Sequence, residues 1–266
     1  MQVDFDIILR TCLNNSVQPW DRIIDLPKNI ITLKCVKSLI NSINNFDDSK
    51  VNMKLTVIDD HSSADNLTLL LDILNTCNRP VNVIELTDTG YNNSALEQFK
   101  LGHDNDSLVY MVEDDYFHAH NAIEEMFNAW WYFRSIKDPL YDIAIYPYDS
   151  THLYWPDDNR PIEPALLYNF RNWYWRTTTK TSNTMLIHSN TIKKYWVLFE
   201  ALATQFPNVT EDDTINRLYN NGVNAGGPVC LFSPVPSLAV HISYHKPTIM
   251  DQTFIDWVKC FNDLEL

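Results

Sequence analysis

The first half of the chain alternates short apolar runs with longer stretches in which apolar residues recur at helical spacing. This pattern predicts strands and helices in turn: strands at 5–9, 55–58, 81–86 and 108–112, and helices at 31–46, 94–101 and 119–136. Repeated strand and helix units are typical of parallel strands that are joined by right-handed crossovers. The sequence therefore predicts an α/β fold with a mostly parallel, doubly wound central sheet flanked by helices.

The second half is less regular, because prolines interrupt it and aromatic residues crowd into YNFRNWYW at 168–175. Its apolar runs predict three strands and two helices: strands at 184–188, 229–232 and 237–241, and helices at 191–205 and 212–221. No internal repeat or low-complexity linker separates the halves. We therefore expect a single domain over residues 1–266, made of the halves 1–147 and 148–266.

Composition and charge exclude several functional classes. The chain has 266 residues, with 34 Asp and Glu against 20 Lys and Arg, and the net charge of −14 opposes a surface that binds nucleic acid through its phosphates. Only five glycines are present, and no G-x-G-x-x-G or P-loop phosphate-binding pattern occurs. Any phosphate that the chain binds must therefore be held without a glycine-rich loop. Five widely spaced cysteines without a C-x-x-C pair indicate reduced thiols.

The N-terminal sequence also bears on location. Acidic residues precede its first apolar stretch and no basic segment does, so it does not resemble a secretory signal. No apolar run approaches the roughly 18 residues that a membrane-spanning helix needs. We expect a cytoplasmic protein without a transmembrane segment, and the high Asn content suits a virus-encoded protein that acts in the host cytoplasm, or an A/T-rich microbe.

Acidic residues follow two of the predicted strands directly. Asp59 and Asp60 come after one strand, and Glu113, Asp114 and Asp115 come after another. The carboxyl ends of parallel strands meet at one edge of the sheet, where open α/β sheets bind their ligands. Successive carboxylates repel one another, so a hard divalent cation, Mg²⁺ or Mn²⁺, is a simple way to stabilise them. The alternative is a solvated turn whose acids favour the start of the next helix.

Three further groups have both a functional and a structural interpretation. The acids at 211–213 either cap a helix behind Thr210 or supply a general base, and His241 is either a cation ligand or a strand-end histidine. The aromatic stretch, including Trp173, Trp175 and Arg176, either stacks on a sugar or nucleobase or belongs to the core.

The order of these motifs resembles that of GT-A-fold glycosyltransferases, and it is most similar to the large inverting family called glycosyltransferase family 2. The resemblance covers roughly residues 5 to 245 and rests on six segments in order: IILRTCLNN at 7–15, VIDDHSS at 57–63, NNSALEQFKLG at 92–102, VYMVEDDYF at 109–117, TEDDTINRLY at 210–219 and PSLAVH at 236–241. The chain departs from the family at two places. It has His61 where the family has glycine, and it has Glu97 and Gln98 where the family usually has an Arg-Asn pair.

The resemblance implies a role for each motif. Residues 1–147 would form a nucleotide-sugar-binding half, 148–266 an acceptor-binding half, and Asp115 and His241 would bind Mn²⁺ or Mg²⁺. Asp212 would be the general base. The remaining predicted site residues are the donor contacts Thr11, Asp59, Asp60, Asn93, Glu113 and Asp114, and the substrate contacts Trp173, Trp175, Arg176 and Glu211.

The implied reaction moves a sugar, with inversion, from a nucleoside-diphosphate sugar to the hydroxyl of a glycan or another acceptor. Two alternatives remain open. A nucleotidyltransferase that makes sugar nucleotides also places acids beyond a parallel sheet, but it usually has a glycine-rich basic loop after its first strand, which LRTCLNN does not provide. A module that binds a nucleotide sugar without catalysis would keep the fold and lose the base.

Overall fold

The computed structural model describes residues 2–14, 24, 26–149, 164–223, 226–242 and 255–266. Its strands are β1 (Val3–Thr11), β2 (Val51–Asp59), β3 (Val81–Glu85), β4 (Leu108–Glu113), β5 (Tyr116–His118), β6 (Asp142–Ile145), β7 (Leu167–Phe170), β8 (Trp173–Thr177), β9 (Met185–His188), β10 (Tyr219–Asn220), β11 (Val229–Val235) and β12 (Ala239–His241). Its α-helices are α1 (Lys28–Asn45), α2 (Ala64–Leu74), α3 (Tyr91–Asp104), α4 (Ala122–Ile136), α5 (Ser189–Lys194), α6 (Trp196–Gln205) and α8 (Trp257–Asp263).

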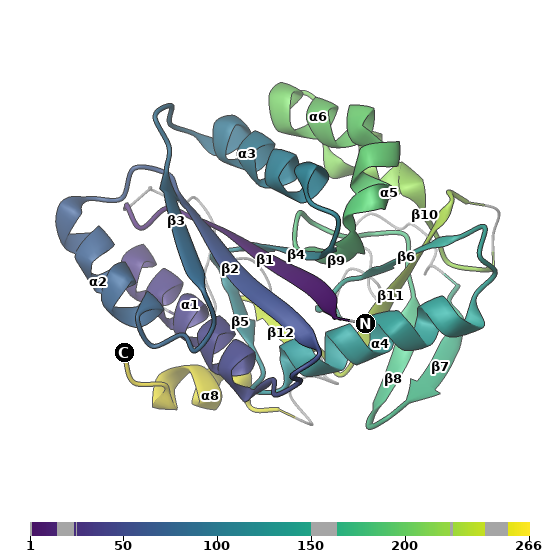
Figure 1. Ribbon diagram of the computed structural model, residues 1–266, viewed down its shortest axis with the longest axis horizontal. Helices are drawn as coiled ribbons and strands as arrows, with labels where there is room; N and C mark the ends of the chain where they lie inside the picture. Colours follow the sequence, from purple (N-terminus) through teal and green to yellow (C-terminus); the bar gives the residue numbers. More distant parts are fainter. Residues whose placement is uncertain (1, 15–23, 25, 150–163, 224–225, 243–254) are drawn as a thin grey trace.

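A ten-stranded sheet runs through both halves of the sequence (Figure 1). Its strand order is β3-β2-β1-β4-β9-β6-β11-β8-β7, with β10 beside β11. The first four strands in this order are parallel, and so are β6 and β11, whereas β9 runs antiparallel to both of its neighbours and β7 pairs with β8 as a hairpin. The predicted α/β fold with a mostly parallel central sheet is confirmed.

Helices cover both faces of this sheet (Figure 1). Helices α3, α5 and α6 pack together on one face, and α1, α2 and α4 lie on the other. Helix α8 packs against α1 and β5, where Lys34 Nζ donates to the Phe261 carbonyl at 2.8 Å and the Phe117 and Phe261 rings lie 5.2 Å apart. No helix in the described ranges is both long and apolar enough to cross a membrane.

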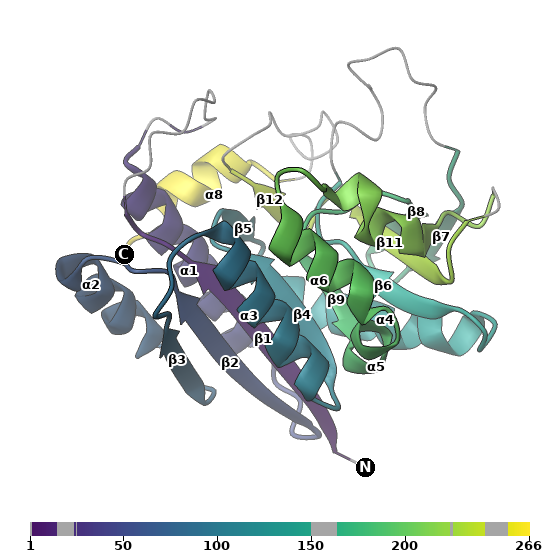
Figure 2. The same ribbon diagram turned by 90° about the horizontal axis from the view of Figure 1, so that it is seen from above.

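The connection order creates a switch point between β1 and β4. After β1 the chain adds β2 and then β3 on one side, and it returns through α3 to place β4 on the other side of β1. Ligands of open α/β sheets bind beyond the carboxyl ends of the strands at such a point. In the strand register, Thr11 lies opposite Asp59 and Arg10 lies opposite Glu113, so the two predicted acidic clusters do share this edge. Figure 2 shows β5 and β12 on the side of the molecule where β1 and β4 end, away from the N-terminus.

Two predicted helices differ from the structure. The helix expected at 191–205 divides at Tyr195 into α5 and α6. The prediction of a helix at 212–221 is wrong. The segment forms two short 3-10 helices, η2 (Glu211–Asp213) and η3 (Ile215–Leu218), and β10 follows them. The break falls at Thr214, whose φ of −128° and ψ of −102° lie outside the helical region.

Several elements were not predicted: α2, β5, β6, the β7–β8 hairpin, β10 and α8. Helix α2 does have a start signal, because the Ser63 side chain accepts a hydrogen bond from the Asn66 backbone at 3.4 Å. In the hairpin, alternate residues of a strand face opposite sides of the sheet, so the crowded aromatic sequence reflects packing on two faces. Phe133 of α4 stacks on Phe232 of β11 at 3.7 Å and lies 5.9 Å from the Trp175 ring.

The buried imidazole of His118 makes the stability of the fold depend on pH. Its Nε2 lies 2.8 Å from the Tyr110 hydroxyl, and burial lowers the pKa of His118 to about 3. In the unfolded chain the pKa of a histidine is about 6.5, so protons bind the unfolded state preferentially below that pH.

We therefore expect His118 to reduce the free energy of unfolding by about 1.4 kcal/mol for each pH unit from about 6.5 downward. Urea unfolding of the native chain and of His118→Gln between pH 5 and 7.5 measures this slope, since the acidic residues that titrate in both proteins cancel in the difference. Equal slopes in the two proteins would contradict the expectation.

Candidate functional site

Asp115 and His241 form a carboxylate–imidazole pair beyond the end of β4. Asp115 occupies the turn between β4 and β5, and His241 ends β12, which pairs with β5. Asp115 Oδ2 lies 2.8 Å from His241 Nε2, and both side chains are about one quarter exposed, at 25% and 23%. Burial alone would lower the pKa of His241, but the neighbouring carboxylates, Asp115 above all, raise it. The contact with Asp115 therefore favours the protonated form of this imidazole.

Asp114 is turned toward the protein. Its Oδ2 accepts a hydrogen bond from the Cys12 backbone N–H at 2.9 Å, and the hydroxyls of Thr11 and Thr32 lie at 3.4 Å. Burial raises the pKa of this carboxyl group. Asp114 therefore fastens the end of β4 to β1 and α1, and the predicted donor residue Thr11 is one of its contacts.

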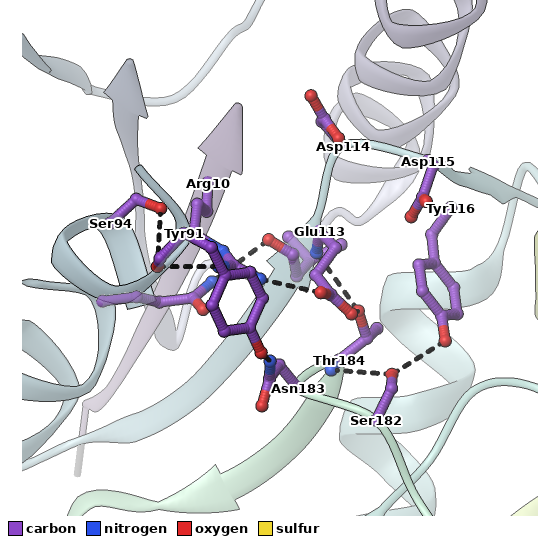
Figure 3. Close-up of polar contacts among 12 residues, drawn as sticks. Arg10, Tyr91, Ser94, Glu113, Asp114, Asp115, Tyr116, Ser182, Asn183 and Thr184 are labelled. Atoms are coloured by element: carbon purple, nitrogen blue, oxygen red, sulfur yellow. Dashed lines mark hydrogen bonds and ion pairs between the residues drawn. The ribbon is translucent and has the colours of Figure 1, made fainter. Parts of the chain in front are cut away.

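Glu113 is paired with Arg10 on the neighbouring strand (Figure 3). Arg10 Nη2 lies 2.7 Å from Glu113 Oε1, and the guanidinium carbon lies 4.4 Å from the centre of the Tyr91 ring. The Asn183 amide donates to the Tyr91 hydroxyl at 2.5 Å, and the Glu113 backbone N–H donates to the Thr184 hydroxyl at 3.1 Å. Sequence reasoning missed this cluster, although an arginine inside the apolar run IILRT was a visible signal.

The two acids after β2 have different partners. Asp59 is buried, and its two oxygens accept hydrogen bonds from the Ser62 backbone at 2.9 Å and the Ser62 hydroxyl at 2.5 Å. Asp60 accepts from the Gly90 N–H at 3.1 and 3.0 Å through its two oxygens. Gly90 has a φ of 109°, which favours glycine, and precedes α3. Asp59 therefore shapes the turn, and Asp60 joins the turn to the start of α3.

The α3 segment presents little to this edge. Asn93 is exposed on the first turn of α3, and its amide donates to the Thr89 carbonyl at 3.0 Å. Gln98, which stands in the place of the family's Arg-Asn pair, is fully buried and donates to the Ile8 and Val112 carbonyls at 2.8 and 3.1 Å. Gln98 therefore holds the backbones of β1 and β4.

The acidic turn η2 divides its three carboxylates among three environments. Asp213 accepts hydrogen bonds from the Thr210 backbone and hydroxyl at 3.1 and 3.0 Å, so the predicted cap at Thr210 is present. Asp212 contacts Lys180 Nζ and accepts from the Asn216 amide at 2.8 Å, and its side chain is about half exposed. Burial raises the pKa of Glu113, and the nearby carboxylates of Asp115 and Glu211 add to that rise. The turn therefore adjoins the edge at β4.

The predicted aromatic wall lies elsewhere. Trp173, Trp175 and Arg176 belong to β8, and β9, β6 and β11 lie between β8 and β4 in the sheet. Trp175 has no exposed surface and packs against Phe133. A ring without an exposed face cannot stack on a sugar, so the expected role of Trp175 is corrected to that of a core residue. Trp173 is partly buried, and Arg176 is 5% exposed.

Comparisons with known proteins give only distant likenesses. A scan against family models finds no match, and no curated protein matches in sequence. The chain is similar to the structure of S. aureus TarS at 14% identity and a TM-score of 0.48, covering 100% of this chain and 41% of TarS. It is also similar to the mannosyltransferase PcManGT from Pyrobaculum calidifontis in complex with GDP-Man and Mn²⁺, at 14% identity and a TM-score of 0.47, covering 87% and 57% of the two chains.

A third similar structure is that of the galactosyltransferase LgtC in complex with donor and acceptor sugar analogues, at 12% identity and a TM-score of 0.43, covering 85% of this chain and 72% of LgtC. A fragment of TarS has been solved in complex with UDP-GlcNAc. This chain spans less than half the length of TarS. Likenesses this weak do not assign a function, which has to follow from the residues of this chain.

Proposed function

We propose that this chain is a GT-A-fold glycosyltransferase that moves a sugar from a nucleoside-diphosphate sugar to an acceptor hydroxyl with inversion. The observation that carries the proposal is the Asp115–His241 pair, which lies beyond the switch point between β1 and β4. Asp60 follows β2 at the same edge, and Glu211 of the acidic turn η2 is among the charges that act on Glu113 there. Residues 1–147 then serve the donor and 148–266 the acceptor.

A divalent cation suits this edge on electrostatic grounds. Within the described residues no three His, Cys, Asp or Glu side chains converge as a complete metal site, but Asp115 and His241 supply one oxygen and one nitrogen ligand. These residues would hold Mn²⁺ or Mg²⁺, and the imidazole favours Mn²⁺. When bound, the cation would offset the charge of the donor diphosphate and stabilise it as a leaving group. Without it, the carboxylates of this edge and the net charge of −14 would repel the donor.

The loop after β1 provides a fixed surface for the nucleotide. The Leu13 N–H donates to the Ser62 hydroxyl at 3.0 Å, and the Ser63 N–H donates to the Asn14 amide oxygen at 3.0 Å. These bonds fasten the 11–14 segment to the turn that carries Asp60. A surface fixed before binding orients the donor at little entropic cost, and Asp60 is the carboxylate there that would contact the ribose or base.

We assign the role of general base to Asp212. Its carboxylate is about half exposed, and Lys180 and Asn216 contact its Oδ1. The carboxylate would accept the proton of the acceptor hydroxyl while that oxygen attacks the anomeric carbon on the face opposite to the diphosphate. The bond to the diphosphate breaks as the new glycosidic bond forms, and the configuration is inverted.

The direct test is a panel of nucleotide sugars, each offered with Mn²⁺, with Mg²⁺ and with a chelator. We expect one donor to raise the Tm in the presence of Mn²⁺ and to be hydrolysed slowly, since a ligand at 100 times its Kd adds about 2.7 kcal/mol to the free energy of unfolding. The chelated samples are the matched control. Indifference to every donor with either cation would contradict the proposal, and binding without any turnover would favour the non-catalytic module.

A further inference from the structure

Arg10 is a buried cation at the donor edge to which no role has been assigned. It is the penultimate residue of β1, is 8% exposed, and its guanidinium lies between the Glu113 carboxylate at 2.7 Å and the ring of Tyr91 at 4.4 Å. Its Nη1 also lies 3.4 Å from the Tyr91 carbonyl. These contacts fix the guanidinium on Glu113, which is the leading acid of the EDD motif.

The Glu113 carboxylate is occupied at both oxygens. Its Oε1 receives Arg10, and its Oε2 lies 3.5 Å from the Thr184 hydroxyl. Figure 3 shows the side chain directed toward Arg10 and Thr184, with Asp115 on the far side of the strand end. The Glu113 carboxylate is therefore directed at Arg10 and Thr184, although only one residue separates Glu113 from Asp115 in sequence.

The Arg10–Glu113 pair determines how many carboxylates are available as ligands for a cation. Hard divalent cations gain affinity with each added carboxylate ligand. If Arg10 were neutral, Glu113 would be an unbalanced carboxylate beside Asp115, and a divalent cation would be the nearest charge to compensate it. With Arg10 present, that negative charge is already balanced within the protein.

We propose that Arg10 determines the cation ligands by withholding Glu113, so that Asp115 and His241 bind the ion and Glu113 does not. The inference rests on the proposed function. A site with few protein ligands would hold an ion weakly, so we expect it to fill together with the donor, whose phosphate oxygens are further hard ligands. The imidazole among so few ligands makes Mn²⁺ preferred over Mg²⁺.

The test measures cation binding by the purified chain without any donor, by titration calorimetry for Mg²⁺ and by electron paramagnetic resonance for Mn²⁺. We expect Arg10→Met to bind Mg²⁺ at least about tenfold more tightly than the native chain, because a carboxylate is released. Arg10→Lys, which keeps the charge, and the double variant Arg10→Met with Glu113→Gln should bind like the native chain. Adding the active nucleotide sugar to the native chain should tighten Mn²⁺ binding.

A Glu113→Gln variant tests the same idea without removing Arg10. Measured without donor, its Mn²⁺ affinity should fall by less than about tenfold, because the variant leaves Arg10 as an unbalanced nearby charge but removes no ligand. A loss of tenfold or more would overturn the proposal, and so would a folded Arg10→Met chain with native affinities. Either result leaves the proposed function intact, whereas a native chain that binds no divalent cation with any donor would refute the metal-dependent transferase itself.

Discussion

Replacing Asp212 by Asn should lower the rate of sugar transfer about 10²- to 10⁴-fold while donor binding is retained, because an amide cannot accept the proton of the attacking hydroxyl. The side chain keeps its size and its hydrogen bond from Asn216, so the turn should still form. The measurement is kcat for donor hydrolysis, and for transfer once an acceptor is found, together with the donor-induced shift in Tm.

The acidic turn offers matched controls for this substitution. Asp213 closes the capping box with Thr210, so Asp213→Asn should reduce thermal stability and leave kcat nearly unchanged. Glu211→Gln removes the carboxylate that lies nearer to Glu113. If Asp212→Asn retained transfer and Glu211→Gln abolished it, Glu211 would replace Asp212 as the base.

Replacing Asp115 by Asn should remove the response to Mn²⁺ and lower transfer by about 10³-fold, since the cation contributes several kcal/mol of charge stabilisation in reactions of this kind. His241 would lose its carboxylate partner in the same variant. The expected result is a donor-induced Tm shift that no longer depends on Mn²⁺ or on a chelator.

Asp114→Asn is the control for this second prediction. Asn keeps an oxygen that can accept the Cys12 N–H, so cation-dependent donor binding should survive with a modest loss of stability. Retention of the full Mn²⁺ response by Asp115→Asn, or its loss only in Asp114→Asn, would contradict the assignment of the ligand to Asp115.

Sequence alone predicted the part of the fold that depends on local pattern. Apolar runs located β1, β2, β3 and β4, and the position of Asp59, Asp60 and the EDD motif after these runs located the edge. The rule that parallel strands end at one edge needs no knowledge of side-chain partners. This is why the edge could be predicted before its geometry was known.

The partners of each carboxylate could not be predicted in this way. Arg10 and Glu113 are far apart in sequence, and so are Asp115 and His241, so their pairing depends on strand order and register. Local pattern also favoured a helix at 212–221, where the Asp213 cap and the break at Thr214 produce short turns. The burial of Trp175 could not be predicted either, because Phe133, which packs against it, belongs to another element.

Strand β9 of the second half runs antiparallel to both of its neighbours, β4 and β6, which belong to the first half. The main chain of one half therefore completes the hydrogen bonding of the other. Cutting the chain after β6 would expose a bare flank of β4, which is a template for intermolecular pairing and aggregation. The second half therefore cannot be exchanged as an independent cassette without exposing β4.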